Sequence, residues 1–212
     1  FDHAATPPDD AGAPLAWRMR PRNLDEFVGQ EHLLGQGKLL RRMLAADRLV
    51  SLILYGPPGT GKTALAHVIA ATVNAEWEEL NAAASNLREL RDKIALAEKR
   101  RRQGRRTVLF IDELHRFHRG QQDALLPDVE RGTLVLIAAT TFNPFFAINS
   151  PLISRSQIFE FKPLSDEHIK ALLRRAAADP ERGMGRWRVE FTEEALDHLA
   201  RTSDGDARRA LT

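Results

Sequence analysis

The residues best suited to chemistry in this 212-residue chain are the adjacent carboxylates Asp112 and Glu113 and the glycine-rich segment GPPGTGKT over 56–63. Asp112 and Glu113 follow the apolar run VLFI, and like charges beside a buried strand are costly unless a cation lies against them. In the second segment, glycines let the backbone curl so that its N–H groups point at one anion. Together the two segments predict a site for a phosphate ester and a cation.

The segment 56–63 follows the strand-like residues LILY and precedes a helical pattern, which is the context of a P-loop. In that context Lys62 binds the phosphates of a nucleoside triphosphate, and the Thr63 hydroxyl ligates Mg²⁺. Asp112 is expected to hold the Mg²⁺ shell, and Glu113 to orient and deprotonate the water that attacks the γ-phosphate. The predicted phosphate cradle consists of Gly56, Pro57, Pro58, Gly59, Thr60, Gly61, Lys62, Thr63 and Ala64.

His115 and His118 are an alternative pair of metal ligands, because they lie three residues apart beside these acids. A zinc site needs three or four protein ligands, and the sequence here has neither an HExxH motif nor a convincing third ligand. A divalent cation shared with phosphates is therefore the favoured interpretation.

Short strand-like runs alternate with helical patterns along the chain. Strands that alternate with helices predict a parallel sheet covered on both faces. The strand-like runs are 49–55, 76–80, 107–111, 133–140 and 157–161, and the main helical patterns between them are 62–72 and 86–102.

The chain is expected to have three parts. Residues 1–14, rich in Pro, Asp, Ala and Gly, predict a disordered tail, and residues 15–162 predict the α/β domain. Residues 163–212 predict a helical unit whose amphipathic helices open at the caps Ser165 and Thr192. The chain starts without Met and stops within a helical pattern, so this unit is expected to be truncated.

Composition narrows the classes further. The chain is 43% hydrophobic and 28% charged with a formal net charge of +2, which predicts a globular protein without a strong overall field toward nucleic acid. It has no cysteine, so disulfides and thiolate chemistry are excluded. It has no apolar run of about 18 residues and no signal-peptide pattern. A cytoplasmic location without a membrane partner is therefore the expectation.

Beyond these motifs, the sequence from about 15 to 212 resembles an AAA+ ATPase. The resemblance implies a P-loop NTPase (AAA+) α/β fold, followed by part of an all-helical lid, with ATP and Mg²⁺ as ligands. Three further segments carry it: RPRNLDEFVGQEHLLG resembles the segment that packs over adenine in clamp loaders and Holliday-junction motors, ATTFNP resembles a γ-phosphate sensor, and SPLISRS resembles the clamp-loader SRC box. The implied residues are Arg20, Pro21, Val28 and Gly29 around the base, Asn143 as sensor, and Arg155 reaching a neighbouring subunit's ATP.

In the same way, GDARRAL near the end of the chain resembles the second sensor of the AAA+ lid. The resemblance implies that Arg208 reaches the nucleotide, with Arg209 as the neighbouring candidate. A polar residue at the end of the second strand is thought to restrain the catalytic glutamate in AAA+ relatives. Asn81 is therefore expected to restrain Glu113 until DNA binds.

The segments DELHRFHRGQQDALLPDVERGT and TTFNPFFAINSPLISRS are similar to those of the RarA/MgsA group, the replication-associated recombination proteins related to the Werner-helicase-interacting ATPase. The resemblance implies a DNA-dependent ATPase that remodels DNA or protein at stalled replication forks and single-strand gaps. It also implies single-stranded or forked DNA and single-strand-binding protein as partners, a homotetramer or ring in the full-length protein, and association with the nucleoid. A clamp-loader subunit and a non-hydrolysing ATP-dependent adaptor are the alternatives. Phe142 departs from the group, which usually has Glu there, and Phe145 and Ala147 replace small or acidic residues.

Two basic clusters are candidate DNA contacts. The run over 99–106 holds six cations, and it is interpreted as a solvated helix end. The cluster after the adjacent acids is favoured as a phosphate contact, and it consists of His115, Arg116, His118 and Arg119.

The large aromatic residues are expected to pack inside the protein. Phe145 and Phe146 could form a wedge against DNA, but adjacent aromatics near a strand end predict core. Trp17, Trp77 and Trp187 are scattered and are likewise interpreted as packing residues.

Overall fold

A computed structural model describes residues 12–212, so most of the predicted tail over 1–14 lies outside the described residues. Five strands form one sheet in the order β2-β3-β4-β1-β5, and all pairs are parallel. The predicted parallel α/β fold is therefore confirmed. The strands are β1 Leu52–Tyr55, β2 Glu76–Asn81, β3 Thr107–Asp112, β4 Val135–Thr140 and β5 Gln157–Glu160.

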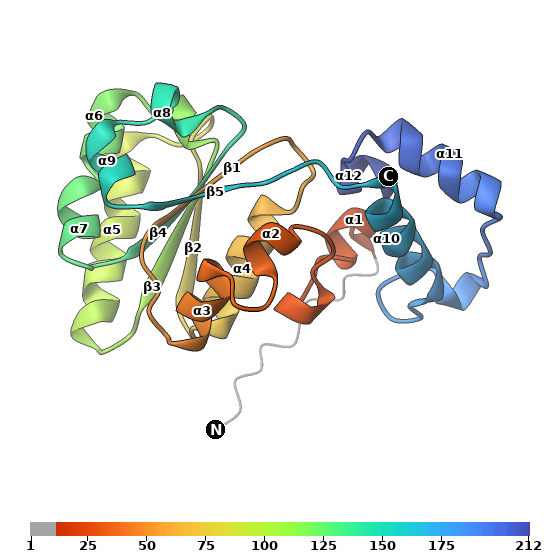
Figure 1. Cartoon of the computed structure of the whole chain (residues 1–212). Coiled ribbons are helices and arrows are strands. Elements are labelled where there is room, and N and C mark those ends of the chain that lie inside the picture. The colour runs from red at the N-terminus through yellow and green to blue at the C-terminus, as the bar shows by residue number, and fades with distance from the viewer. Residues whose placement is uncertain (1–11) are drawn as a thin grey trace.

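Helices cover both faces of the sheet, and a helical unit follows β5 (Figure 1). The predicted helix over 62–72 is confirmed in its bounds as α4, and the predicted helix over 86–102 is α5, for which Asn86 is the N-cap. The helices are α1 Leu15–Arg18, α2 Glu31–Leu34, α3 Leu39–Ala45, α4 Lys62–Thr72, α5 Leu87–Arg102, α6 Arg119–Asp123, α7 Leu126–Glu130, α8 Pro144–Ala147, α9 Ser150–Ser154, α10 Asp166–Ala178, α11 Glu193–Ser203 and α12 Ala207–Ala210.

The strands are apolar because both of their faces are buried. Alternate residues of β3 point to opposite faces: Phe110 packs with α3 and α4 in one core, and Leu109 and Ile111 pack with α5 and α9 in the other. Figure 1 shows α3 and α4 on one side of the sheet and α5, α7 and α9 on the other. The two cores hold the carboxyl ends of the strands, and the residues that follow them, in fixed positions.

A third core joins the helical unit to the start of the described chain. Leu173 and Leu196 of α10 and α11 pack with Met19, which follows α1. Ser165 and Thr192 cap α10 and α11 by accepting hydrogen bonds from His168 N and Ala195 N, which confirms the predicted helix starts. None of the helices among residues 12–212 is long and apolar enough to cross a membrane.

The predicted burial of Phe145 and Phe146 is wrong. The two residues are 65% and 90% exposed. They lie on α8, a four-residue helix in which Pro144 is buried and the two phenylalanines point outward. The predicted packing of Trp187 is also wrong, because this residue is 67% exposed. Trp77, in contrast, stacks between His67 and Phe110 as a packing residue.

The basic run over 99–106 forms ion pairs with neighbouring acids. Arg100 bonds to Glu78 at 2.6 Å, and Arg106 bonds to Asp47 at 2.6 Å. These contacts join the end of α5 and the entry to β3 to β2 and to the loop before β1. The run therefore serves the packing of the sheet edge in addition to being the solvated helix end that was predicted.

Candidate functional site

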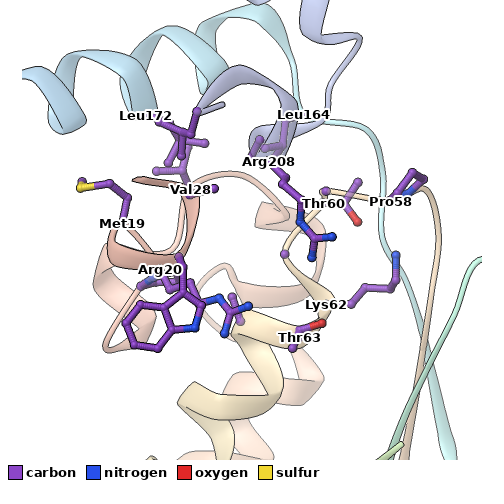
Figure 2. A pocket seen from close by; sticks show the side chains of 18 of the residues that line it. Met19, Arg20, Val28, Pro58, Thr60, Lys62, Thr63, Leu164, Leu172 and Arg208 are labelled. Carbon is purple, nitrogen blue, oxygen red and sulfur yellow. The ribbon is translucent and has the colours of Figure 1, made fainter. Parts of the chain in front are cut away.

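A cavity of about 570 Å³ opens at the carboxyl edge of the sheet, between the segment after α1 and the helices α10 and α12. A volume of this size accommodates a ligand the size of a nucleotide. Figure 2 shows side chains from all three regions around it. Its wall includes Trp17, Met19, Arg20, Pro21, Val28, Pro58, Gly59, Thr60, Gly61, Lys62, Thr63, Ala64, Asp112, Glu113, Thr141, Leu164, Leu172, Arg175, Arg208 and Leu211.

The loop between β1 and α4 has the conformation that its glycines permit. Gly59 and Gly61 have φ values of +66° and +98°, a region that residues with a Cβ rarely adopt. A Cβ at Gly56 would overlap the carbonyl of Phe161. The free N–H groups at the start of the eleven-residue α4 thus lie beside the cavity, where they can bind an anion.

Lys62 is the buried cation of this loop. Its Nζ donates hydrogen bonds to Gly56 O at 2.8 Å and to Pro57 O at 2.6 Å. Burial lowers the pKa of Lys62, and the charges of Glu113 and Asp112 oppose that shift. Its partners here are neutral carbonyls, so an anion in the cavity offers this ammonium group a stronger interaction.

Two arginines add to the positive charge of the cavity. Burial, and then the charge of Arg208, lowers the pKa of Arg20. Arg208 also acts against the charged form of Lys62. Figure 2 shows the side chains of Arg20, Lys62 and Arg208 around the same space. Because these cations repel one another, a ligand with several negative charges stabilises the arrangement.

The two carboxylates end β3 on the other side of the cavity. Asp112 is the last residue of the strand, and Glu113 has a φ of +54°. A non-glycine residue with positive φ is uncommon and occurs often at functional sites. This turn places both carboxylates on the cavity wall, where Thr63 from the first turn of α4 also lies.

Oxygen ligands such as Thr63 and Asp112 fit Mg²⁺, which takes few ligands from the protein and the rest from phosphates and water. Among residues 12–212, no group of three or more His, Cys, Asp or Glu side chains is placed to hold a metal ion. His115 and His118 therefore have no third protein ligand for zinc within that part of the chain. A metal here depends on the oxygens of a bound phosphate.

The carboxylate of Glu113 contacts residues that the sequence did not single out for it. Its Oε2 lies 3.1 Å from Nδ1 of His115 and accepts a 3.4 Å hydrogen bond from the Thr141 hydroxyl. The side chain of Asn81, which was expected to restrain Glu113, accepts a 2.9 Å hydrogen bond from Ala83 N. The contacts of Glu113 therefore come from the next turn and from the end of β4.

The predicted sensor Asn143 lies away from the cavity wall. Its side chain accepts a 3.0 Å hydrogen bond from Phe145 N and caps α8. Thr141 does line the cavity and bonds to Glu113, and its position directly after the strand TLVLIAAT could have indicated it. The prediction for Asn143 depends on a conformation in which this cap opens.

The end of the cavity near α1, where the base was expected, combines apolar side chains with Arg20. Arg20, Pro21 and Val28 lie on its wall as expected, whereas Gly29 does not. Gly29 has a φ of +77° and lies against Leu164 and His168. Trp17 also lines the wall, with the Arg20 guanidinium 5.7 Å from its ring centre. Sequence reasoning could have found Trp17, because it lies only three residues before the expected base-pocket residue Arg20.

The phosphate cradle is also mostly on the wall. Residues 58–64 line the cavity, while Gly56 and Pro57 are not among the lining residues. Gly56 and Pro57 instead supply the carbonyls that bind Lys62. All nine predicted residues thus form one continuous segment, made of the loop after β1 and the first turn of α4, in which Gly56 and Pro57 contact Lys62 and not the cavity.

Arg155 lies outside the cavity of its own chain. Its Nη2 is 2.6 Å from Glu130 Oε1, and its Nη1 donates to Pro151 O at 3.0 Å. Arg208, in contrast, is on the cavity wall. Of Arg155 and Arg208, the structure brings only Arg208 to the site, where it joins Arg20.

Comparison with known proteins places this geometry in a family. Residues 52–164 match the model of the ATPase family associated with various cellular activities (AAA). The chain is 49% identical over 203 residues to the replication-associated recombination protein A of Escherichia coli strain K12, covering 96% of this chain and 45% of that protein. It is 43% identical over 198 residues to the protein of that name from Bacillus subtilis, covering 93% and 46%.

A solved structure gives the same result for the fold. The structure titled Thermotoga maritima RuvB Holliday junction branch migration motor matches with a TM-score of 0.72 and 29% identity, covering 92% of this chain and 63% of that chain. The chain spans less than half the length of the two curated relatives named above. The chain therefore belongs to the AAA family of ATPases, and its resemblance to the replication-associated recombination protein A group is confirmed over nearly all of its length.

Proposed function

We propose that this chain is the ATP-hydrolysing part of a Mg²⁺- and DNA-dependent ATPase that remodels DNA or protein at stalled replication forks and single-strand gaps. The observation that carries the proposal is the meeting of Lys62, Arg20 and Arg208 with Asp112 and Glu113 around one cavity. Cations for a triphosphate and an acid pair for metal and water are the parts that phosphoryl transfer requires. The names of the replication-associated relatives and of the branch-migration motor support the biological setting.

In the proposed reaction, Lys62 and the loop N–H groups bind the β- and γ-phosphates. Glu113 takes a proton from the attacking water as the bond from the γ-phosphorus to its bridging oxygen breaks, which yields ADP and phosphate. Thr63 and Asp112 would hold Mg²⁺, which when bound neutralises charge on the phosphate oxygens. Arg208 reaches the phosphates from the lid.

The proposed assembly is a homotetramer or ring of the full-length protein, in which Arg155 acts on the neighbour's ATP. In the described chain Arg155 is exposed and paired with Glu130, a pair that is weak enough at the surface to exchange for a phosphate.

Single-strand-binding protein is the proposed protein partner, and the nucleoid is the proposed location. The proposal also divides the chain into an ATPase domain over 15–162 and a lid from 163. The lid helices α10 and α12 support it, because Leu172 and Arg208 close one side of the cavity.

The test is ATP turnover of the full-length protein with no DNA, with single-stranded DNA, with duplex ends and with forked DNA. We expect Mg²⁺-dependent turnover that rises with single-stranded or forked DNA. Lys62→Ala is the loss-of-binding control, because alanine suits the first turn of α4 while the substitution removes the phosphate cation.

Other outcomes would contradict the proposal. Nucleotide binding without turnover under any condition would identify a non-hydrolysing adaptor. Stimulation only by a sliding clamp would identify a clamp-loader subunit. Turnover that is the same with and without each DNA would refute DNA as the partner. Turnover that persists after chelation of Mg²⁺ would refute Mg²⁺ as the cofactor.

A further inference from the structure

Three phenylalanines form an exposed surface directly after β4. Phe142, Phe145 and Phe146 are 58%, 65% and 90% exposed, and we call them the aromatic surface. Large aromatic side chains dominate buried cores and interfaces, so several exposed within five residues indicate a surface that binds something. The ribbon of α8, which carries two of them, lies near α6 at the periphery of the α/β domain (Figure 1).

Cations lie beside this surface. The Asn149 side chain donates a 3.3 Å hydrogen bond to Arg119 O, and the Gln122 side chain donates a 3.4 Å bond to Ala147 O. These contacts hold the start of α6 against the α8–α9 segment, and Figure 1 shows α6 and α8 close together. The exposed side chains at that end of α6 and in the turn before it are Arg116, His118 and Arg119.

The combination of exposed rings and cations fits single-stranded DNA. Every base offers a flat face for stacking on an aromatic ring, and each nucleotide carries a phosphate for a nearby cation. A duplex hides its base faces, and a purely apolar partner would make no use of the cations. The occupant that matches both features is a strand with unpaired bases.

The aromatic surface also contacts the group that touches Glu113. The His115 and Phe142 rings are 4.5 Å apart at an angle of 59°. His115 Nδ1 lies 3.1 Å from Glu113 Oε2 and 2.9 Å from Thr140 Oγ1. Thr140 Oγ1 in turn accepts a 3.1 Å hydrogen bond from Phe142 N. Phe142 is thus connected to His115 in two ways. Its ring contacts the His115 ring directly, and its backbone N–H bonds to Thr140, which contacts His115.

The burial and hydrogen bonding of His115 suit it to connect Phe142 with Glu113. Its side chain is 9% exposed, and its Nε2 is buried without a hydrogen-bond partner. Burial lowers the pKa of His115, which favours the neutral ring. A neutral ring has one N–H, and the nearby carboxylate favours that proton on Nδ1, where it can donate to Glu113.

We infer that unpaired bases of single-stranded DNA stack on Phe142, Phe145 and Phe146, and that Phe142 and His115 transmit this occupation to Glu113. In this inference Phe146 and Phe145 are binding residues and His115 is a positioning residue. It rests on the proposed DNA-dependent ATPase and states which contact makes the activity depend on DNA. The exposed Arg116, His118 and Arg119 then bind the phosphates of the same strand, whereas the side chain of His115, which was predicted as part of this basic cluster, is only 9% exposed and lies against Glu113.

The binding test compares an oligonucleotide with one of the same length that lacks its central bases, using the full-length protein at fixed salt. We expect wild type to bind the intact strand about tenfold more tightly, as loss of a stacked base predicts. Phe146→Ala should remove this preference, and Phe146→Leu should not restore it because leucine has no flat face. Trp187→Ala is the matched control, since it removes an aromatic that is also largely exposed (67%) on the helical unit.

Salt dependence separates bases from phosphates. Phe146→Ala should leave the slope of affinity against salt unchanged, whereas Arg119→Ala should reduce it by roughly one phosphate contact. If Phe146→Ala keeps the preference for bases, the inference is refuted. If it weakens both oligonucleotides equally and changes the oligomeric state, the surface is a contact between protein copies and the inference is also refuted.

The coupling test measures the ratio of DNA-stimulated to basal ATP turnover. His115→Leu should bring the ratio close to one, while His115→Asn should restore much of it because the Asn amide can donate a hydrogen bond in place of Nδ1. Affinity for ATP, measured in parallel, should be similar in both variants. A His115→Leu protein that responds to DNA as wild type does would refute the coupling, whereas a wild type that ignores DNA would refute the proposed function itself.

Discussion

The cavity and the surface around Arg155 differ in whether one chain supplies all the side chains that the proposed reaction needs. At the cavity, residues from the P-loop, β3, the segment after α1 and α12 meet on one wall. Arg155, at the end of α9, lies outside that wall and pairs with Glu130. Folding of one chain thus assembles the nucleotide cavity, whereas the proposed role of Arg155 depends on a second copy of the chain. Variants on the two sides should therefore fail in different ways.

The largest effect is expected for Arg155→Ala. Turnover of the assembled full-length protein should fall about 10³-fold, the lower end for an arginine supplied by a neighbour. Affinity for ATP should change little, because Arg155 is absent from its own chain's cavity. Glu130→Ala, which frees Arg155, is the control. Equal turnover of Arg155→Ala and wild type, measured by phosphate release, would contradict the proposed action of Arg155 on a neighbour's ATP.

Glu113→Gln tests the cavity side. Turnover should fall about 10²-fold, as expected when a general base is lost, while bound ATP is retained because glutamine keeps the size of the side chain. The measurement is single-turnover hydrolysis together with ATP binding. A variant that loses binding and hydrolysis to the same extent would show that Glu113 organises the cavity rather than the water.

A smaller effect is expected for Gly59→Ala. Its φ of +66° disfavours a Cβ, and the new methyl would overlap the carboxylate of Asp206, the N-cap of α12. ATP affinity should fall about tenfold, in line with the cost of a strained residue. Gly37→Ala is the matched control, because Gly37 has a φ of +73° with no atoms near the missing Cβ. Similar affinity losses in both variants, by titration with a fluorescent ATP analogue, would mean that the lid contact is irrelevant.

The smallest effect concerns pH. Burial, followed by the charge of Arg20, lowers the pKa of His67, and burial lowers that of His115. Between these folded pKa values and the unfolded value of about 6.5, the unfolded chain binds more protons, so stability rises with pH there and falls on acidification. His67→Tyr, which keeps an aromatic ring beside Trp77, should reduce the acid loss measured by urea unfolding at pH 5 and 7. An unchanged loss would remove His67 as a cause.

Much of the fold was predictable because its signals are local. The helix over 62–72 was predicted with its observed bounds, since a glycine turn starts it and its apolar residues recur with helical spacing. The exposure of Phe145 and Phe146 was not predictable in this way. Apolar residues near a strand end usually turn inward, and only the brief α8, anchored by its buried Pro144, directs them outward.

The site shows the same limit. Lys62, Thr63, Asp112 and Glu113 could be assigned roles because each lies within a short motif of fixed spacing. The contact between His115 and Glu113, and the place of Thr141, depend on the positive φ of Glu113 and on the pairing of β3 with β4. No periodicity encodes either feature.

Sequence reasoning alone predicted a nucleoside triphosphate site at a glycine turn and a pair of acids after a buried strand. These are consequences of residue type and spacing along a few turns of chain. The folded chain added which other side chains share a wall with these motifs: Trp17 and Thr141 line the cavity, whereas Asn143 caps α8 away from it. The parallel sheet brings distant loops to one edge, and no local pattern shows which neighbours a side chain meets there.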